Sequence, residues 1–229
     1  MKRFYKQAEA LEAGAGWTVQ LDGRAIKTQG GQPLLLPTQA LAELLAEEWN
    51  RQGEEIDPRG FVHRDMADYA IDVVARDTAA LAEKLLAYAE TDTLCYRADP
   101  DEPFWKRQQA VWEPLVSAFE AREGVRLERV SGIIHRAPPS ETLDRLRTRL
   151  RAFDPFTLAA LETLTSLAAS LCTGLSALEP DADADALWDA ANLEEDWQVE
   201  QWGQDEEAAE RRAKRREQFL KALEFARAA

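Results

Sequence analysis

Few side chains in this sequence stand at the spacings that catalytic or metal sites need. The histidines, His63 and His135, belong to no His-Glu-x-x-His or Glu-x-x-His pattern, so a zinc or di-iron site is not predicted. Cys172 lies in an apolar segment, which is more typical of a buried thiol than of an activated nucleophile. The sequence also has no glycine-rich phosphate loop of either common type. We therefore expect no cofactor, no metal and no catalytic residue.

The most informative pattern is a polar pair inside an apolar stripe over residues 184–202. If this segment forms one helix, Glu195 and Gln198 lie on its apolar face. Trp188 and Trp202 share that face. A carboxylate among such rings is desolvated and needs a hydrogen-bond donor or a cation. The sequence leaves two partners open: an internal arginine or backbone group, or a basic group of a bound protein.

Tryptophan is frequent, with seven in 229 residues. These rings fill protein cores, but tryptophan is also enriched at binding hot spots. Trp105 and Trp112 share a predicted helix that Pro114 should bend, because the proline ring displaces a main-chain hydrogen bond. Composition alone does not separate core tryptophans from binding ones.

Charge narrows the range of partners. The chain has 28 lysines and arginines against 42 aspartates and glutamates, a net charge of −14 at pH 7. This charge repels nucleic acid and anionic lipid. The basic run at 211–216 follows acidic residues at 205–207, an order that suits the dipole of a solvated helix. We therefore expect no nucleic-acid partner.

Two further features bear on the compartment. The least charged stretch, 163–178, is shorter than the roughly 20 apolar residues that cross a bilayer, and serines and threonines dilute it. It predicts a buried helix and no membrane insertion. Cys95 and Cys172 are far apart and form no Cys-x-x-Cys pair, so we expect no disulfide and a reducing compartment.

The elements that position these residues fall into two parts. In residues 1–60, the alternation on both sides of Asp22-Gly23 is typical of a tight hairpin. A short apolar run at 34–36 suits a third strand, and helical spacing with a threonine cap predicts a helix over 39–52. A helix packed on a small sheet is the expected arrangement.

Residues 61–229 show mostly the period of a helix. Predicted helices span 65–76, 78–90, 101–123, 140–152, 155–178, 184–202 and 205–227. The segments 94–96 and 125–134 suggest short strands, which pair with each other or join the first sheet; both options stay open. The predicted fold class is α+β, with a small N-terminal α/β domain over 1–60 and a larger all-α helical domain over 61–229.

Short motifs follow one another along nearly the whole chain. They are Arg3-Phe4-Tyr5-Lys6, Gly16-Trp17, Leu21-Asp22-Gly23-Arg24, Glu48-Trp49, Ala70-Ile71-Asp72, Thr91-Asp92-Thr93-Leu94-Cys95-Tyr96-Arg97, Trp112-Glu113-Pro114-Leu115, Gly132-Ile133 and Glu195-Asp196-Trp197-Gln198-Val199-Glu200-Gln201-Trp202-Gly203. In this order they resemble the ATP-twelve family, the assembly chaperones of F-type ATP synthase. The last motif is the most specific of them.

The resemblance implies a chaperone, not an enzyme, that binds the unassembled alpha subunit of the catalytic sector and promotes its assembly into the alpha–beta hexamer. The client-binding residues implied by the matching motifs are Glu195, Gln198, Glu200, Trp202, Trp49, Trp112, Asp92, Tyr96 and Arg97, with Glu195 as the first choice. Eukaryotic relatives work in the mitochondrial matrix and carry a transit peptide. Because the sequence starts without one, we expect a bacterial cytoplasmic protein, monomeric when free.

Two other functions remain open. The chain could be a helical adaptor for a different client. It could also be a small-molecule enzyme that uses buried carboxylates at Glu195 and Asp92, which requires these side chains to converge in a closed pocket.

Overall fold

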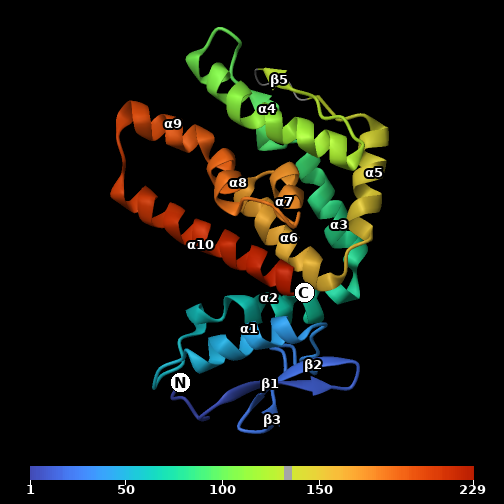
Figure 1. The fold of residues 1–229 in the computed structure, drawn as a ribbon, viewed down its shortest axis with the longest axis vertical. Coiled ribbons are helices and arrows are strands. Elements are labelled where there is room, and N and C mark those ends of the chain that lie inside the picture. Colours follow the sequence, from blue (N-terminus) through green and yellow to red (C-terminus); the bar gives the residue numbers. More distant parts are fainter. Residues whose placement is uncertain (132–135) are drawn as a thin grey trace. The chain divides into compact units, whose positions relative to one another are not determined.

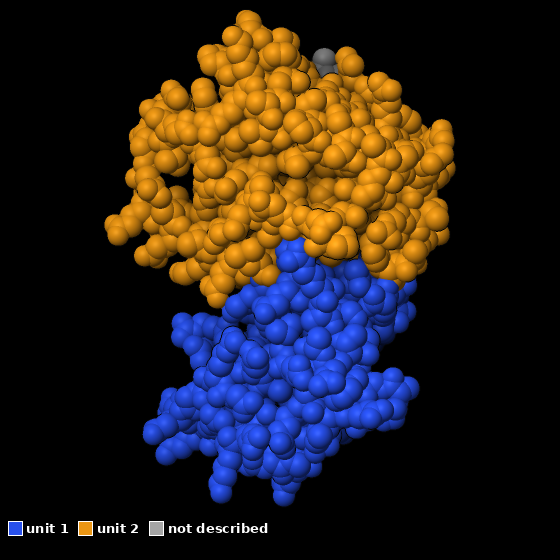
Figure 2. Space-filling view, viewed as in Figure 1, with its two compact units in different colours: residues 1–78, 154–160, 221–229 blue, residues 79–153, 161–220 orange. Residues whose placement is uncertain are grey.

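The computed structural model describes residues 1–131 and 136–229. Gly132, Ile133 and His135 lie outside the described residues. The chain divides into two compact units, shown in different colours in Figure 2. Unit 1 comprises residues 1–78, 154–160 and 221–229, and unit 2 comprises residues 79–153 and 161–220. The predicted division into domains 1–60 and 61–229 stays a prediction.

Unit 1 contains an antiparallel sheet of three strands in the order β1-β2-β3 (Figure 1). The strands are β1 (Ala8–Ala13), β2 (Gly16–Leu21) and β3 (Arg24–Ala25). Asp22 and Gly23 have φ angles of 47° and 80°, as the turn between paired β2 and β3 requires, so the predicted hairpin is confirmed.

Two details of this sheet differ from the prediction. The run at 34–36 forms no strand; Leu36 makes a single bridge to Trp17, with backbone hydrogen bonds of 2.7 and 2.8 Å. Strand β1 was not predicted, because half of its six residues are alanine and its apolar alternation is weak.

A helix packs on this sheet as expected. α1 spans Gln39–Asn50, and Thr38 caps it by accepting a 3.1 Å hydrogen bond from the backbone N–H of Leu41. The Asn50 side chain exchanges hydrogen bonds of 2.8 and 2.9 Å with the backbone of Ala8, which fixes β1 to the end of α1. Buried residues of α1 and β2, among them Val19, Leu41 and Leu45, form the core.

Helix α2 (Val62–Asp72) begins at a cap that comes from α1. The buried carboxylate of Glu48 accepts the backbone N–H groups of His63 and Arg64, at 2.7 and 2.9 Å. These are two of the donors that the first turn of a helix leaves without an intrahelical partner. The predicted helix at 65–76 thus starts three residues earlier and ends in a separate turn of 3-10 helix, Val74–Arg76.

The rest of the described chain is mainly helical (Figure 1). Its helices are α3 (Thr78–Leu86), α4 (Pro103–Glu123), α5 (Ser140–Arg151), α6 (Pro155–Ala168), α7 (Leu171–Ala177), α8 (Ala184–Ala191), α9 (Leu193–Trp202) and α10 (Glu206–Ala228), with 3-10 turns at Pro58–Gly60, Ala87–Ala89 and Thr93–Cys95. The fold class is α+β, as predicted. Among the described residues, no helix is long and apolar enough to cross a membrane.

The two predicted strand segments pair with each other. β4 (Tyr96–Arg97) and β5 (Val130–Ser131) form a parallel pair that is separate from the N-terminal sheet. The two segments therefore pair with each other and do not join the first sheet, which settles the choice that the sequence left open.

Two helices that were predicted as continuous are broken. The predicted helix 155–178 is interrupted at Ala169, which has φ 48°, and the buried Ser170 then caps α7 by accepting the N–H of Thr173 at 2.9 Å. The predicted helix 184–202 was also wrong: it is two helices, α8 and α9, separated at Asn192. This second break changes the geometry of the predicted site.

Candidate functional site

The break before α9 results from two side chains that occupy the last carbonyls of α8. The indole N–H of Trp112, on α4, donates a 2.7 Å hydrogen bond to the carbonyl of Ala190. In a continuous helix that carbonyl would accept from residue 194 instead. Asn192 places its own side-chain amide on the carbonyl of Trp188, at 2.8 Å. Short polar side chains that bond the backbone in this way disfavour a helix interior.

The break moves Glu195 to a new environment. The sequence pattern placed Glu195 in the middle of a long apolar stripe, but it lies in the first turn of α9, together with Glu194 and Asp196. A carboxylate at a helix N-terminus is favoured by the helix dipole, typically by about 0.3–1 kcal/mol. The half-buried Glu195 therefore needs less compensation than the continuous stripe implied.

Two other carboxylates of α9, Asp196 and Glu200, pair with arginines of unit 2. Arg212 donates two hydrogen bonds to Asp196, one of them 2.9 Å long, and these bonds raise the pKa of Arg212. Glu200 pairs with Arg107 of α4 at 2.5 Å. The Gln198 amide contacts Glu194 at 3.4 Å. All three contacts keep these side chains on the surface of α9.

Glu195 is the exception. Within the described part of the chain, its carboxylate makes no hydrogen bond and no ion pair. The charge of Arg212 acts on it, but the guanidinium is bonded to Asp196. Of the partners that the sequence left open, an internal arginine is therefore not bonded to Glu195, and a carboxylate remains available for an external cation.

The aromatic residues of α9 differ in exposure. The ring of Trp197 packs 5.5 Å from that of Phe104 on α4, and the Arg107 guanidinium lies 5.8 Å from the same indole. Trp202, at the end of the helix, is 79% exposed. Leaving so large an apolar ring in water is unfavourable, so an exposed tryptophan at a helix end is a typical anchor for a bound protein.

Trp112 and Arg97 lie in the interior of unit 2. Arg97 is buried, donates a 3.1 Å hydrogen bond to the carbonyl of Gln108 and contacts Glu113 at 3.3 Å. Burial lowers the pKa of Arg97. Its guanidinium also lies 5.3 Å from the Trp112 ring. These residues hold the α4 indole against α8 and thereby set where α9 begins.

Asp92 is buried and bonded to the backbone. Its two carboxylate oxygens accept the N–H groups of Leu94, at 3.1 Å, and Cys172, at 2.9 Å. Burial raises the pKa of Asp92 to about 6, although these hydrogen bonds favour the ionised form. The hydroxyl of half-buried Tyr96 donates to the carbonyl of Glu90 at 3.4 Å. Asp92 thus joins the turn before β4 to the start of α7.

Cys172 and Cys95 are both free and buried. Burial raises the pKa of each thiol, to a value well above the ordinary one for Cys172. A buried, protonated thiol is a packing residue, which agrees with the interpretation of Cys172 from the sequence.

Trp49 belongs to unit 1, whereas the other eight predicted residues belong to unit 2. Its indole packs at 4.5 Å from Phe61 and 5.4 Å from Tyr5, whose hydroxyl donates a 2.6 Å hydrogen bond to the Trp49 carbonyl. The predicted set therefore divides into three groups. The surface of α9 carries Glu195, Gln198, Glu200 and Trp202; the interior of unit 2 holds Trp112, Asp92 and Arg97 with Tyr96 half-buried; and unit 1 contains Trp49.

The sequence did not reveal Arg107 and Arg212, which hold the charges of α9. Arg107 is distant from α9 in the sequence. Arg212 belongs to the basic run at 211–216, which the sequence analysis interpreted only as a solvated helix face. The one signal in the sequence that could have indicated these arginines was the excess of acidic residues in α9, because such an excess is stabilised by cations from neighbouring helices.

An unpaired carboxylate and an open tryptophan on one short helix are the residue types that protein-binding surfaces use. Known proteins agree with this class. The sequence profile described as ATP12 chaperone protein matches residues 2–120. The chain therefore belongs to the ATP12 chaperone family, the chaperones of ATP synthase assembly.

Relatives of known structure cover almost the whole chain. The crystal structure of Atp12 from Paracoccus denitrificans has 35% sequence identity and a TM-score of 0.94, and the match covers 99% of this chain and 97% of that one. A protein of Agrobacterium tumefaciens proposed to be a chaperone has 38% identity and a TM-score of 0.95, covering 99% of this chain and 85% of that one. The protein atp12, mitochondrial, of Schizosaccharomyces pombe is 27% identical over 221 residues, covering 91% of this chain and 76% of the relative.

Proposed function

We propose that this chain binds the unassembled alpha subunit of the F-type ATP synthase catalytic sector, promotes its assembly into the alpha–beta hexamer and catalyses no reaction. Membership of the ATP12 chaperone family supports a role in this assembly. A subunit without its neighbours exposes interface surface, and contiguous apolar patches drive aggregation. A chaperone protects such a face if it binds more weakly than the final neighbours do, because the hexamer contacts can then displace it.

The observation that carries the proposal is the surface of α9. There, the unpaired carboxylate of Glu195 and the 79% exposed ring of Trp202 lie on one ten-residue helix. The indole supplies apolar contact area, and the carboxylate orients a basic group of the client. Gln198 and Glu200 lie at the rim, where polar contacts contribute to specificity more than to affinity.

The remaining predicted residues act less directly in this proposal. Trp112 and Arg97 hold the start of α9, and Asp92 and Tyr96 stabilise the segment around β4. Their effect on the client would then be exerted through the surface that they position. Trp49 lines a cavity of unit 1.

Capture of purified subunits tests the proposal. The alpha and beta subunits, expressed separately, are each incubated with the immobilised chaperone, and the bound fraction is measured. We expect retention of alpha and not of beta. Capture of neither would contradict the client assignment, and co-purification of another protein from a cell extract would identify an adaptor with a different client.

Glu195→Lys tests the site within the same assay. We expect the variant to fold but to lose about 90% or more of alpha capture, because the reversed charge repels the basic group of the client. Glu206→Lys is the matched control, since it makes the same charge change at an exposed position of α10 that is not among the predicted client-binding residues. Equal capture by both variants would refute the role of Glu195, and loss of folding in Glu195→Lys would show that the residue is structural.

We also propose that the chain works in the bacterial cytoplasm as a monomer when free. The higher identity to the two bacterial relatives, 35% and 38%, than to the mitochondrial one, 27%, supports the bacterial compartment. Fractionation of the source cells and light scattering of the purified protein test these two points; a membrane-bound or dimeric protein would contradict them.

A further inference from the structure

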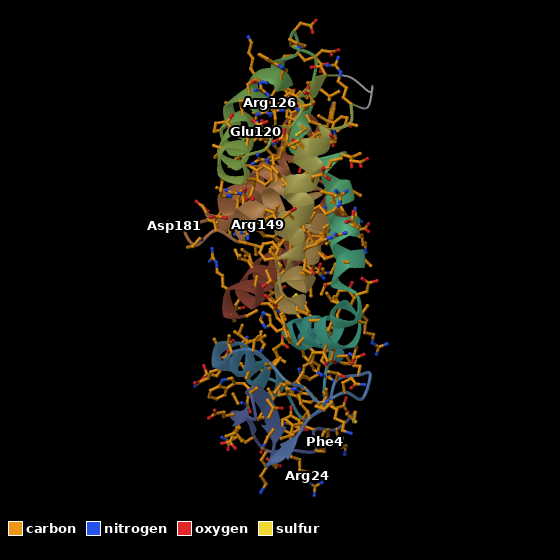
Figure 3. All side chains as sticks on the ribbon, turned by 90° about the vertical axis from the view of Figure 1, so that its right-hand side faces the viewer. Phe4, Arg24, Glu120, Arg126, Arg149 and Asp181 are labelled. Carbon is orange, nitrogen blue, oxygen red and sulfur yellow. The ribbon has the colours of Figure 1, made fainter. Side chains whose placement is uncertain are left out.

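Unit 1 contains a cavity of about 530 Å³ beside the hairpin turn of the sheet. Its wall includes Phe4, Trp49, Arg24, Lys27 and Arg64. Figure 3 labels Phe4 and Arg24, which lie close together in the region of the sheet. All of these residues belong to unit 1, so the cavity is formed by one compact unit.

The cations of this wall lack carboxylate partners at hydrogen-bond distance. The side chains of Arg24 and Lys27 make no hydrogen bond and no ion pair with the described residues. Arg64 approaches Asp68 at 3.7 Å, which is longer than a hydrogen bond. Elsewhere in the described chain, arginines such as Arg129 are bonded to carboxylates. Two cations without an ion pair, and a third with only a long one, therefore line one cavity in a protein with a net charge of −14.

One carboxylate, Asp22, stands in this wall against three cations. Asp22 accepts hydrogen bonds from the backbone N–H groups of Lys6, at 3.0 and 3.1 Å, and Gln7, at 3.0 Å. These bonds lower the pKa of Asp22, so the group stays ionised while bonded to the backbone. The cavity therefore keeps a positive edge that can receive an anionic group.

Aromatic side chains form the other part of the wall. Trp49 is 6% exposed, and its indole N–H has no acceptor among the described residues. The Arg64 guanidinium lies 5.0 Å from the Trp49 ring, which holds this cation at the cavity wall. Phe4 is 65% exposed and offers an apolar surface next to the cations.

We propose that this cavity is a second client-binding site that takes an acidic peptide segment. A carboxylate of the segment lies among Arg24, Lys27 and Arg64, and a neighbouring apolar side chain packs on Phe4. A free inorganic anion would use the cations but not the exposed ring, so the combination favours a peptide. The inference rests on the proposed function, because it takes the occupant to be part of the same protein client.

Labelled peptides test the site directly. The probe is a fluorescein-labelled peptide with two glutamates beside a phenylalanine, and its anisotropy is measured with the full-length chain. A second probe has glutamine in place of both glutamates. Variants Arg24→Glu and Lys27→Glu are compared with Arg76→Glu, an exposed arginine of unit 1 outside the cavity that undergoes the same charge change.

The expected result is binding of the acidic peptide that weakens about tenfold or more in Arg24→Glu and Lys27→Glu and less than about twofold in Arg76→Glu. Binding should also weaken as salt is added, because the cations lie at an open edge. Equal binding of the glutamine peptide, equal weakening in all three variants, or displacement by inorganic phosphate alone at similar concentration would each overturn the proposal.

The intact client separates this inference from the proposed function. If the unmodified chain captures the alpha subunit and Arg24→Glu captures it equally well, the second site is refuted while the function stands. If the unmodified chain captures no alpha subunit, the proposed function fails, and the peptide experiment still decides whether the cavity binds acidic segments.

Discussion

The protonation state of Asp92 should make the stability of this protein depend on pH in a predictable way. Two opposing effects act on this carboxylate. Burial disfavours the charged form, whereas the N–H groups of Leu94 and Cys172 favour it by donating to both oxygens. Burial is the larger effect and raises the pKa of Asp92 from 3.8 to about 6.

The direction and size of the pH dependence of stability follow from this rise in pKa. Because the folded chain holds the Asp92 proton to higher pH than the unfolded chain does, the proton stabilises the fold at low pH. This contribution is fully present below about pH 4 and is lost as the pH rises through about 6. A pKa rise of about two corresponds to roughly 3 kcal/mol in the free energy of unfolding.

Urea unfolding of the unmodified chain and of Asp92→Asn, measured across this pH range, isolates the group. Asparagine does not titrate and directs an N–H₂ group toward one of the two backbone donors, so the variant carries a constant penalty. The difference in unfolding free energy between the two proteins should therefore change by about 2.5 kcal/mol between pH 4 and pH 7, with the unmodified chain relatively more stable at the acidic end.

The result that would refute this reasoning is a difference between the two proteins that does not vary with pH. It would mean that the backbone donors outweigh burial and that Asp92 is ionised throughout. Asp68, whose pKa burial also raises to about 6, is present in both proteins, so its titration cancels in the difference.

The exposed and buried tryptophans should respond differently to substitution. Trp202→Ala should change the unfolding free energy by less than about 0.5 kcal/mol and yet weaken alpha-subunit capture about tenfold or more, which urea unfolding and the capture assay check together. Trp112→Phe leaves the Ala190 carbonyl without its donor and should cost about 2–4 kcal/mol in urea unfolding. It should also reduce capture per folded molecule, and unchanged capture would show that α9 does not depend on this bond.

Local signals were sufficient for much of the fold. Asp22 and Gly23 provide the positive φ angles of the hairpin, and Thr38 caps α1 at the residue where its hydroxyl can reach the backbone. Such features depend on neighbours within a few positions, so a single sequence reveals them. The order of the short motifs along the chain was equally informative about the family, although it does not show how the motif residues are arranged in space.

The helix breaks were not predictable in the same way. Ala169 and Asn192 are neither glycine nor proline, and periodicity continues across both. The break at Asn192 depends on the Trp112 indole, which lies 78 positions from Ala190 in the sequence. A bond between such distant residues leaves no trace in spacing. For the same reason, the sequence could not distinguish the buried Trp49 and Trp112 from the open Trp202.

The position of the break explains how an unpaired carboxylate is tolerated on α9. In a continuous helix, Glu195 would be an interior residue and would need a cation for compensation. Because α9 starts at Leu193, the same carboxylate lies in a first turn whose backbone N–H groups have no carbonyl partners within the helix. The Trp112 bond that ends α8 therefore lets Glu195 remain unbonded, and a surface of this kind can bind a client's cation without first breaking an internal ion pair.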